Sequence, residues 1–408
     1  MIEKAKRMAA FKPGIFADLK KEKEDWQKTH SEKVIDFSIG SPDIPPEPGI
    51  IKAITDAAAD PKNYRYAITA LPEMTEEIRK WYKERYGTDL GDDEIALLQG
   101  SQEALGALPQ IFINEGDGVL IPDPYYPIYA DSARLAGGDV LFMPLKPEND
   151  YLIDFDAIPE KDLAKAKMMI VSYPNNPTGA TAPDSFYEKL IAFAKKHNIL
   201  VVHDNAYSDL VFDGQKGRSF LSFPGAKEVG IELNSFSKSY GMAGARLGVL
   251  VGNKDVVKAY KDYKSNMDYG IFLPVQYGGI EALKHGGSSI EANRKTYAHR
   301  RDVLVDAFGK AGWQIPKSGG TMFVWAPIPA SYADADAFAH DLLNKTGLVV
   351  TPGTRFGKEG QRFVRIALVE DDAAIEEAAR RIAPFFEKLA QEEDQKLAAQ
   401  KKPAADKQ

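Results

Sequence analysis

Residues 234–248 read N-S-F-S-K-S-Y-G-M-A-G-A-R-L-G, with Lys238 and Arg246 set among three serines and three glycines. A lysine amine can attack a carbonyl to form a Schiff base. Small residues let backbone N–H groups approach an anion, and an arginine binds a phosphate with two parallel hydrogen bonds. The stretch therefore suits a lysine that holds a phosphate-bearing aldehyde. A glycine-rich surface loop with a solvated lysine has the same composition, so this stretch alone leaves both interpretations open.

The bulk composition bounds the class of protein. The chain has 408 residues, enough for two domains with substantial cores. Its hydrophobic content of 44% and charged content of 27% are typical of a globular enzyme. A formal charge of -7 argues against a nucleic-acid or anionic-membrane partner, because both require a basic surface. The absence of cysteine excludes disulfides, thiolate metal sites and a cysteine nucleophile, and we predict no metal site.

Neither targeting nor membrane insertion is indicated. Residues 1–11 carry three basic side chains but lack the apolar core of a signal peptide. No window of the sequence has the apolar length of a membrane helix. We therefore expect a cytoplasmic protein with no membrane partner.

Short apolar runs alternate with helical patterns between residues 94 and 251. Continuous apolar strands between helices predict an α/β fold with a mostly parallel sheet covered on both faces. In such sheets, ligands bind beyond the carboxyl ends of the strands. The residues at or just after these ends are Gly100, Tyr126, Asn176, Asp204 and Lys238. Each also suits turn chemistry or core packing by itself, and their convergence is what favours a ligand site.

The rest of the chain predicts a second domain. After residue 254 come long helical patterns, then a strand–helix–strand section over 322–350, a strand over 363–367 and an amphipathic helix over 371–390. A short strand is expected over 34–39. Residues 391–408 are polar and lack aromatics, which predicts a frayed helix end or a disordered tail. The expected parts are an N-terminal arm that joins the small domain (1–46), a large cofactor domain (47–264), a small C-terminal domain (265–390) and the tail (391–408).

Four motifs, in this order, are similar to those of the class I/II aminotransferases of the aspartate-aminotransferase fold. They are P-N-N-P-T-G at 174–179, H-D-N-A-Y at 203–207, S-F-S-K at 235–238 with Arg246, and F-V-R-I-A at 363–367. The likeness covers nearly the whole chain. Within the family, the segments 143–146 and 265–272 resemble the LL-diaminopimelate aminotransferases and related alanine-forming transaminases. The resemblance implies the fold type I architecture of transferases that depend on pyridoxal 5'-phosphate.

The resemblance also implies roles around the cofactor ring. Lys238 would hold the cofactor covalently and move a proton between the substrate α-carbon and the cofactor. Asp204 would pair with the pyridine nitrogen, which keeps the ring an electron sink. Tyr207 and Asn176 would hydrogen-bond the phenolic oxygen of the ring, and Tyr126 would stack on its face.

Further implied contacts involve the phosphate and the substrate. Arg365 would bind the substrate α-carboxylate through a bidentate pair, with Gly40 and Asn176 beside it. Tyr66 of the partner subunit, or Tyr64 in its place, would reach the phosphate. The remaining cofactor-binding residues implied by the family pattern are Gly100, Ser101, Gln102, Ser235, Ser237 and Arg246.

This chain departs from the family pattern at three places. Ala245 stands where close relatives have a tryptophan, and Gly241 stands where they have an asparagine. Both lie in the expected phosphate loop, so they put its packing in doubt but remove no catalytic group. The match of the partner tyrosine requires a gap across 67–71.

The implied activity is reversible transfer of an amino group from an L-amino acid to a 2-oxo acid, 2-oxoglutarate, by a ping-pong mechanism. It belongs to amino-acid metabolism, including lysine biosynthesis, and the active sites would lie at a homodimer interface. A carbon–sulfur β-lyase is an alternative, since the same lysine serves both reactions. A non-catalytic ligand-sensing module is another, but it predicts an appended DNA-binding domain, and the segment before Val34 is too short to hold one.

Overall fold

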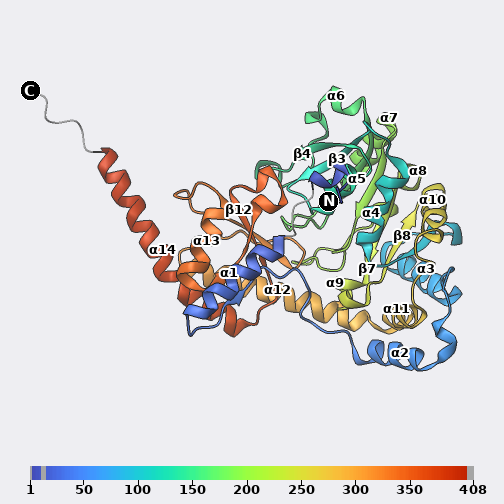
Figure 1. Ribbon diagram of the computed structural model, residues 1–408, viewed down its shortest axis with the longest axis horizontal. Helices are drawn as coiled ribbons and strands as arrows, with labels where there is room; N and C mark the ends of the chain where they lie inside the picture. Colours follow the sequence, from blue (N-terminus) through green and yellow to red (C-terminus); the bar gives the residue numbers. More distant parts are fainter. Residues whose placement is uncertain (1, 11–14, 402–408) are drawn as a thin grey trace, which may run out of the picture. The chain divides into compact units, whose positions relative to one another are not determined.

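The computed structural model of the chain describes residues 2–10 and 15–401 (Figure 1). Its contacts divide the chain into two compact units. The first consists chiefly of Ser41–Tyr297 with Gly319–Met322, and the second of the described parts of 13–40, 298–318 and 323–408. The first unit extends to Tyr297, whereas the sequence predicts a large domain that ends near residue 264. The helices between these two positions pack on the first unit, because α11 (Leu273–His285) contacts α2 (Pro48–Ala59) extensively.

A seven-stranded sheet forms the centre of the first unit. All of its pairs are parallel except those of β8, which runs antiparallel to both of its neighbours. The mostly parallel α/β sheet expected from the continuous apolar runs is therefore confirmed. In spatial order the strands are β2 (Ile95–Leu98), β8 (Gly248–Gly252), β7 (Gly230–Ser235), β6 (Leu200–Asp204), β5 (Ala166–Val171), β3 (Gly118–Asp123) and β4 (Asp139–Pro144).

Helices bury both faces of this sheet, which is why its strands are apolar at successive positions. In β2, Ile95 and Leu97 belong to one apolar cluster, while Ala96 and Leu98 belong to another. Successive side chains of a strand point to opposite faces, so these clusters lie on the two sides of the sheet. The first cluster includes side chains of α3 (Pro72–Tyr86), α7 (Asp184–His197) and α11. The second includes side chains of α4 (Ser101–Phe112), α5 (Ile128–Leu135) and α10 (Lys254–Ser265).

The helix boundaries follow from local sequence. Pro48 and Pro72 lie at the starts of α2 and α3, where a missing N–H costs nothing. Gly87 ends α3 with φ of 68°, and the Asn253 side chain caps α10 by accepting two backbone N–H bonds. Short helices complete the unit: η1 (Lys6–Ala10), η2 (Pro61–Tyr64), η3 (Asp92–Glu94), η4 (Pro147–Asn149), η5 (Phe155–Ala157), α6 (Glu160–Leu163), η6 (Phe220–Ser222), α8 (Ala226–Val229), α9 (Phe236–Ser239) and η7 (Ala243–Ala245).

Two small sheets organise the second unit. One pairs β1 (Ile35–Asp36) with β10 (Leu348–Val349) in parallel. The other is antiparallel, in the order β11 (Thr351–Pro352), β12 (Phe363–Ala367), β9 (Phe323–Pro327). The helical elements are α1 (Ile15–Thr29), α13 (Ala335–Thr346), η8 (Gly353–Phe356), η9 (Lys358–Gly360) and α14 (Asp372–Lys401); α12 (Gly287–Lys310) spans both units.

One expectation for the second unit needs correction. The strand expected over 34–39 has only two residues, because after Asp36 the backbone of Phe37 bonds to both Val349 and Ala367 and the chain then turns. Of the two alternatives expected from residue 391, a frayed helix end or a disordered tail, the described residues show helix as far as Lys401, and residues 402–408 lie outside the described residues. None of the described helices has the length and apolar character needed to cross a membrane.

Candidate active site

One edge of the seven-stranded sheet brings together the residues predicted from strand ends. The carboxyl ends of parallel strands share an edge, so Gly100 after β2, Asn176 after β5 and Asp204 at the end of β6 lie along it. Lys238 follows β7 on the short helix α9. Because β8 runs in the opposite direction, its first residues and the preceding Arg246 lie at the same edge.

Four residues meet at one corner of this edge: Gly100, Ser101, Ser235 and Arg246, which we call the serine–arginine corner. A Cβ built at Gly100 would lie 2.3 Å from Nη2 of Arg246, so the guanidinium lies against this glycine. Ser235 pairs with Gly248 across β7 and β8, and a Cβ built on Gly248 would lie 3.0 Å from the Ser101 nitrogen. Helix α4 begins at Ser101, so its free N–H groups and the arginine offer an anion site.

Two of the three departures from the family pattern, Gly241 and Ala245, lie in the loop that leads to Arg246. Gly241 has φ of 67°, and a Cβ built on it would lie 2.5 Å from the carbonyl oxygen of Ile44. An asparagine would not fit there without a shift of the backbone. Ala245 is half-buried and packs on the apolar cluster beneath α9. Arg246 itself is left-handed, with φ of 56°, and donates from Nη1 to the Ala243 oxygen at 2.9 Å.

Asp204 is a buried carboxylate at the end of β6. Its Oδ2 accepts a hydrogen bond from the Tyr129 hydroxyl at 2.6 Å, and its Oδ1 accepts from the Ala206 nitrogen at 3.3 Å. Burial raises the pKa of Asp204 above its ordinary value, although these two hydrogen bonds and His203 oppose the shift. A cation placed against this carboxylate would offset the cost of burying its charge.

Tyr129 is a site residue that the sequence did not reveal. It lies on α5, is fully buried, and belongs to the apolar cluster of its face. Burial, with Asp204 beside it, raises the pKa of Tyr129 well above its ordinary value, so the hydroxyl stays protonated and can donate. An aromatic side chain at helical spacing is typical of a core residue, and no local signal distinguishes this one.

Removing the Tyr129 hydroxyl should disturb Asp204 specifically. In Tyr129→Phe the carboxylate loses a donor that lowers its pKa, so we expect the pKa of Asp204 to rise further. The acid limb of the pH–rate profile should therefore move to higher pH, and turnover at neutral pH should fall by about ten-fold, the factor for a hydrogen bond of about 1.4 kcal/mol. Kinetics from pH 5 to 9 measure this, with the exposed Tyr277→Phe as control. An unshifted acid limb would contradict it.

Lys238 is held on a short helix that is fixed at both ends. The Ser235 side chain caps α9 by accepting from the Ser237 nitrogen at 3.1 Å. Ser239 donates its hydroxyl to the buried Asp209, and its carbonyl accepts from the Asn293 amide at 3.2 Å. The Lys238 Nζ lies 5.8 Å from the ring centroid of Tyr207. These contacts fix the backbone on both sides of the lysine.

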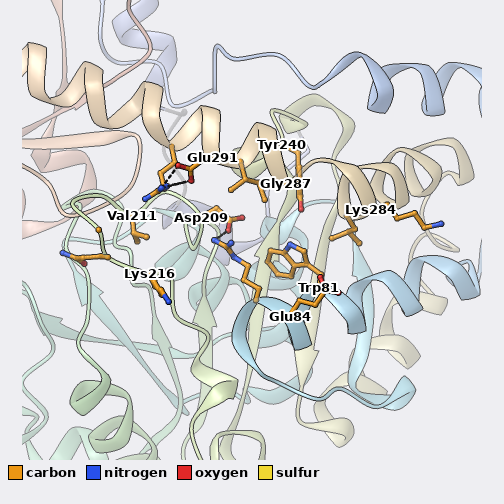
Figure 2. Close-up of a pocket in the computed structure, with 16 residues that line it drawn as sticks. Trp81, Glu84, Asp209, Val211, Lys216, Tyr240, Lys284, Gly287 and Glu291 are labelled. Carbon is orange, nitrogen blue, oxygen red and sulfur yellow. Dashed lines mark hydrogen bonds and ion pairs between the residues drawn. The ribbon is translucent and has the colours of Figure 1, made fainter.

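Asp209 is a second residue that the sequence did not reveal. It is fully buried, bonds Ser239 and pairs with Arg85 at the end of α3. Beside it is a cavity of about 750 Å³ in the first unit, and Figure 2 shows Asp209, Trp81 and Tyr240 around it. The Arg85 guanidinium also lies 5.7 Å from the Trp81 ring centroid. Asp209 thereby ties the lysine helix to α3.

The other predicted ring contacts come from neighbouring strand ends. Tyr126 follows β3, and its hydroxyl donates to the Gln102 side chain at 3.0 Å. Its ring centroid lies 6.0 Å from that of Tyr129, the partner of Asp204. Asn176 and Tyr207 are both buried. Their contacts with a cofactor stay predictions.

Arg365 and Gly40 come together in the second unit. Arg365 is buried on β12, with its guanidinium carbon 4.0 Å from the ring centroid of Phe323 and 4.7 Å from that of Phe356. A Cβ built at Gly40 would lie 3.5 Å from Nη2 of Arg365. Aromatic rings hold a planar guanidinium without using its N–H donors, so this arrangement suits a residue that binds a carboxylate.

The two candidate partner tyrosines belong to a different environment. Tyr66 is 79% exposed and Tyr64 is 64% exposed. The Tyr66 ring lies 5.3 Å from that of Tyr269, and the Tyr64 ring lies 5.4 Å from that of Phe272. Neither tyrosine is buried in the first unit, and both present their rings to the outside.

The residues at the sheet edge fit pyridoxal phosphate on chemical grounds. The serine–arginine corner has the donors and the positive charge that a phosphate requires. The turn at Gly100 leaves no room for a Cβ. Asp204 is a buried carboxylate suited to a cationic pyridine nitrogen, and Lys238 supplies an amine on the same edge.

Comparison with known proteins agrees with this chemistry. Residues 32–382 match the family model described as "Aminotransferase class I and II". The LL-diaminopimelate aminotransferase of Dehalococcoides mccartyi is 42% identical over 93% of this chain and 98% of its own length. The enzyme of the same name from Moorella thermoacetica is 39% identical, over 95% and 100%.

Solved structures show the same relationship. Substrate-bound BacF from Bacillus subtilis matches with a TM-score of 0.90 and 37% identity, over 95% of this chain and 98% of that one. A probable N-succinyldiaminopimelate aminotransferase from Thermus thermophilus matches with a TM-score of 0.85 and 35% identity, over 91% and 100%. The chain therefore belongs to the class I and II aminotransferases and is a transaminase that depends on pyridoxal phosphate.

Proposed function

We propose that this transaminase moves the amino group of LL-diaminopimelate, or of a related L-amino acid, to 2-oxoglutarate by a ping-pong mechanism. The observation that carries the proposal is the likeness to enzymes named LL-diaminopimelate aminotransferase, at 42% identity over 93% of the chain. A relative with this name from Halothermothrix orenii has the same identity and coverage. The expected place in lysine biosynthesis and in the cytoplasm is part of the same proposal.

The residues at the sheet edge divide the work. Pyridoxal phosphate, when bound, supplies an electron sink for the charge that develops at the substrate α-carbon. Lys238 Nζ accepts the α-proton and returns it, which a lysine does when its surroundings keep it neutral at the right moment. Asp204 holds the positive charge of the pyridine nitrogen, with Tyr129 fixing its orientation. Tyr207 and Asn176 hydrogen-bond the ring oxygen.

The remaining roles concern binding. Tyr126, whose hydroxyl donates to Gln102, would stack on the ring face of the cofactor. The phosphate is bound by Gly100, Ser101, Gln102, Ser235, Ser237 and Arg246. Arg365 and Gly40 would bind the substrate α-carboxylate, and the two aromatic neighbours of Arg365 hold the plane of its guanidinium. Asn176 is proposed as a further substrate-binding residue.

Shortening Arg365 to lysine tests its role. Arg365→Lys keeps the charge but loses the fork of two parallel N–H donors, so we expect kcat/KM for the amino donor to fall by about 10- to 100-fold, equivalent to about 1.5–3 kcal/mol. Steady-state kinetics measure this. The exposed Arg380→Lys on α14 is the matched control and should leave kcat/KM unchanged. An Arg365→Lys enzyme with the parent kcat/KM would remove Arg365 from the substrate site.

Comparing amino donors tests the proposed substrate. Purified enzyme with 2-oxoglutarate should form glutamate faster from LL-diaminopimelate than from L-alanine. Faster turnover of alanine would place the enzyme with the alanine-forming transaminases instead. The β-lyase alternative has no support among the relatives named above. Release of ammonia and pyruvate without a 2-oxo acid would revive it.

We further propose that the enzyme works as a homodimer. Four exposed aromatic residues of the first unit, Tyr64, Tyr66, Tyr269 and Phe272, contact one another in pairs, and we call them the aromatic patch. Ile68 and Met267, in the same two segments, are 63% and 62% exposed. Contiguous exposed apolar side chains mark protein–protein interfaces. A second copy would cover this patch, and Tyr66 of the partner subunit would reach the phosphate.

A further inference from the structure

Lys264, near the end of α10, joins two acidic residues that come from different parts of the chain. Its ammonium lies 2.6 Å from Oε1 of Glu103 and 2.6 Å from Oδ2 of Asp268. The Lys264 side chain is only 10% exposed, and the two carboxylates are 22% and 27% exposed. At this burial the three charges are screened less than a surface pair would be. Lys264 therefore bridges Glu103 and Asp268 through two partly buried ion pairs.

Glu103, the first of the two carboxylates, contacts the turn at the expected phosphate site. Glu103 lies in the first turn of α4, the helix that begins at Ser101. Its Oε2 accepts from the backbone nitrogen of Gln99 at 2.6 Å, and its own nitrogen donates to Gly100 at 3.1 Å. Glu103 thus holds the turn Gln99–Gly100–Ser101, against which Arg246 packs.

The Asp268 end belongs to the aromatic patch. Its Oδ1 accepts from the Gly270 nitrogen at 2.9 Å, and the hydrogen bond from Lys264 lowers the pKa of Asp268 although burial opposes this. Gly270 has φ of 105°, and a Cβ built on it would lie 1.8 Å from the Ala67 oxygen. The residues flanking this contact, Tyr269 and Tyr66, are members of the patch whose rings lie tilted at 50° with centroids 5.3 Å apart.

A second contact fixes the same two segments together. The Gln276 side chain donates to the Ile271 oxygen at 2.8 Å and accepts from the Leu71 nitrogen at 2.8 Å. Gln276 is fully buried. These contacts tie the segments 66–71 and 268–272 together, and Lys264 connects them through Glu103 to the turn at Gly100.

We propose that Lys264 is a positioning residue that couples the turn at Gly100 to the aromatic patch, so that binding of pyridoxal phosphate and self-association strengthen each other. The inference rests on the proposed homodimer. A cofactor phosphate in the serine–arginine corner immobilises the turn Gln99–Ser101. Because Glu103 bonds to this turn and to Lys264, and Lys264 bonds to Asp268, the same binding event also restrains Asp268 and the aromatic patch. Conversely, when a second copy covers the patch, it restrains Asp268, Lys264 and Glu103 and thereby the turn at Gly100. By linkage, the two effects have the same size.

The test measures this coupling directly. Sedimentation gives the dimer dissociation constant with and without saturating pyridoxal phosphate, and titration gives the cofactor dissociation constant. In the parent enzyme, the cofactor should tighten the dimer by about ten-fold, within the range usual for coupled sites. In Lys264→Met, this factor should fall to a few-fold, the part that remains being the direct contact of the partner's Tyr66 with the phosphate, and cofactor affinity should fall accordingly. Lys264→Arg keeps a cation between the carboxylates and should restore most of the coupling.

Controls separate this inference from the proposals beneath it. Lys258→Met, an exposed lysine on the same helix, should leave the coupling unchanged. If Lys264→Met does not fold, Glu103→Gln and Asp268→Asn each weaken one of the two ion pairs of Lys264. Each should reduce the factor by which the cofactor tightens the dimer. A parent-like factor in the folded variants would overturn the role of Lys264. A parent enzyme that never dimerises would overturn the dimer as well, whereas glutamate formation would still test the transaminase reaction.

Discussion

Replacing Lys238 by alanine should lower turnover by at least about 10³-fold. General acid–base catalysis by a positioned side chain contributes about 10²–10⁴-fold, and Lys238 also provides the amine that holds the cofactor. The contacts of Ser235, Ser239 and Asp209 fix α9 whatever side chain it carries at position 238, so the helix should survive the change. The loss should therefore reflect chemistry and not unfolding.

Two measurements check this expectation. Single-turnover kinetics with LL-diaminopimelate give the rate, and the visible absorbance of the lysine-bound cofactor should disappear from the variant. Lys189→Ala, which removes an exposed lysine on α7, should keep both the rate and the absorbance. Thermal melting of the two variants should be similar. A Lys238→Ala enzyme with full activity would refute the assignment of this lysine.

The sheet could be predicted because its signal is local. Continuous apolar runs such as 118–121 and 199–202 predict strands buried on both faces, and helical periodicity marks the segments between them. The parallel arrangement then places the strand ends on one edge, which is why Gly100, Asp204 and Lys238 were identified together. The strand over 34–39 was predicted too long because an apolar run does not show where its partner ends. Here that partner, β10, has two residues.

The supporting residues could not be predicted because their partners are distant in sequence. Tyr129 and Asp204 are 75 positions apart, and Glu103 and Lys264 are 161 apart. Spacing within one element does not show such pairs, and a buried tyrosine resembles any other core aromatic. Gly241 illustrates the same point, since its need for a missing Cβ comes from the Ile44 carbonyl. The family pattern identifies the residues expected to contact the cofactor, but it does not include the residues, such as Tyr129, that position them.

Asp204→Asn should separate activity from stability. The variant loses the negative charge opposite the pyridine nitrogen, so turnover should fall by about 10- to 150-fold, since a hydrogen bond to a charged group contributes about 1.5–3 kcal/mol. The substitution lowers turnover, but we expect it to favour the stability of the cofactor-free protein. The folded-state pKa of Asp204 is raised above 3.8, so the folded state holds its proton more tightly than the unfolded state does. Stability therefore falls as the pH rises from about 3.8 through the raised value.

Asparagine has no charge to bury, so cofactor-free Asp204→Asn should be at least as stable as the parent at neutral pH and should lose less stability as the pH rises from about 4. The amide oxygen can still accept from Tyr129, which limits any loss of packing. Denaturant unfolding of cofactor-free protein from pH 4 to 8 measures this, with the exposed Asp156→Asn as control. A strongly destabilised variant would mean that Asp204 holds the fold, whereas a stable and nearly inactive one would mean that its buried charge is maintained for the cofactor.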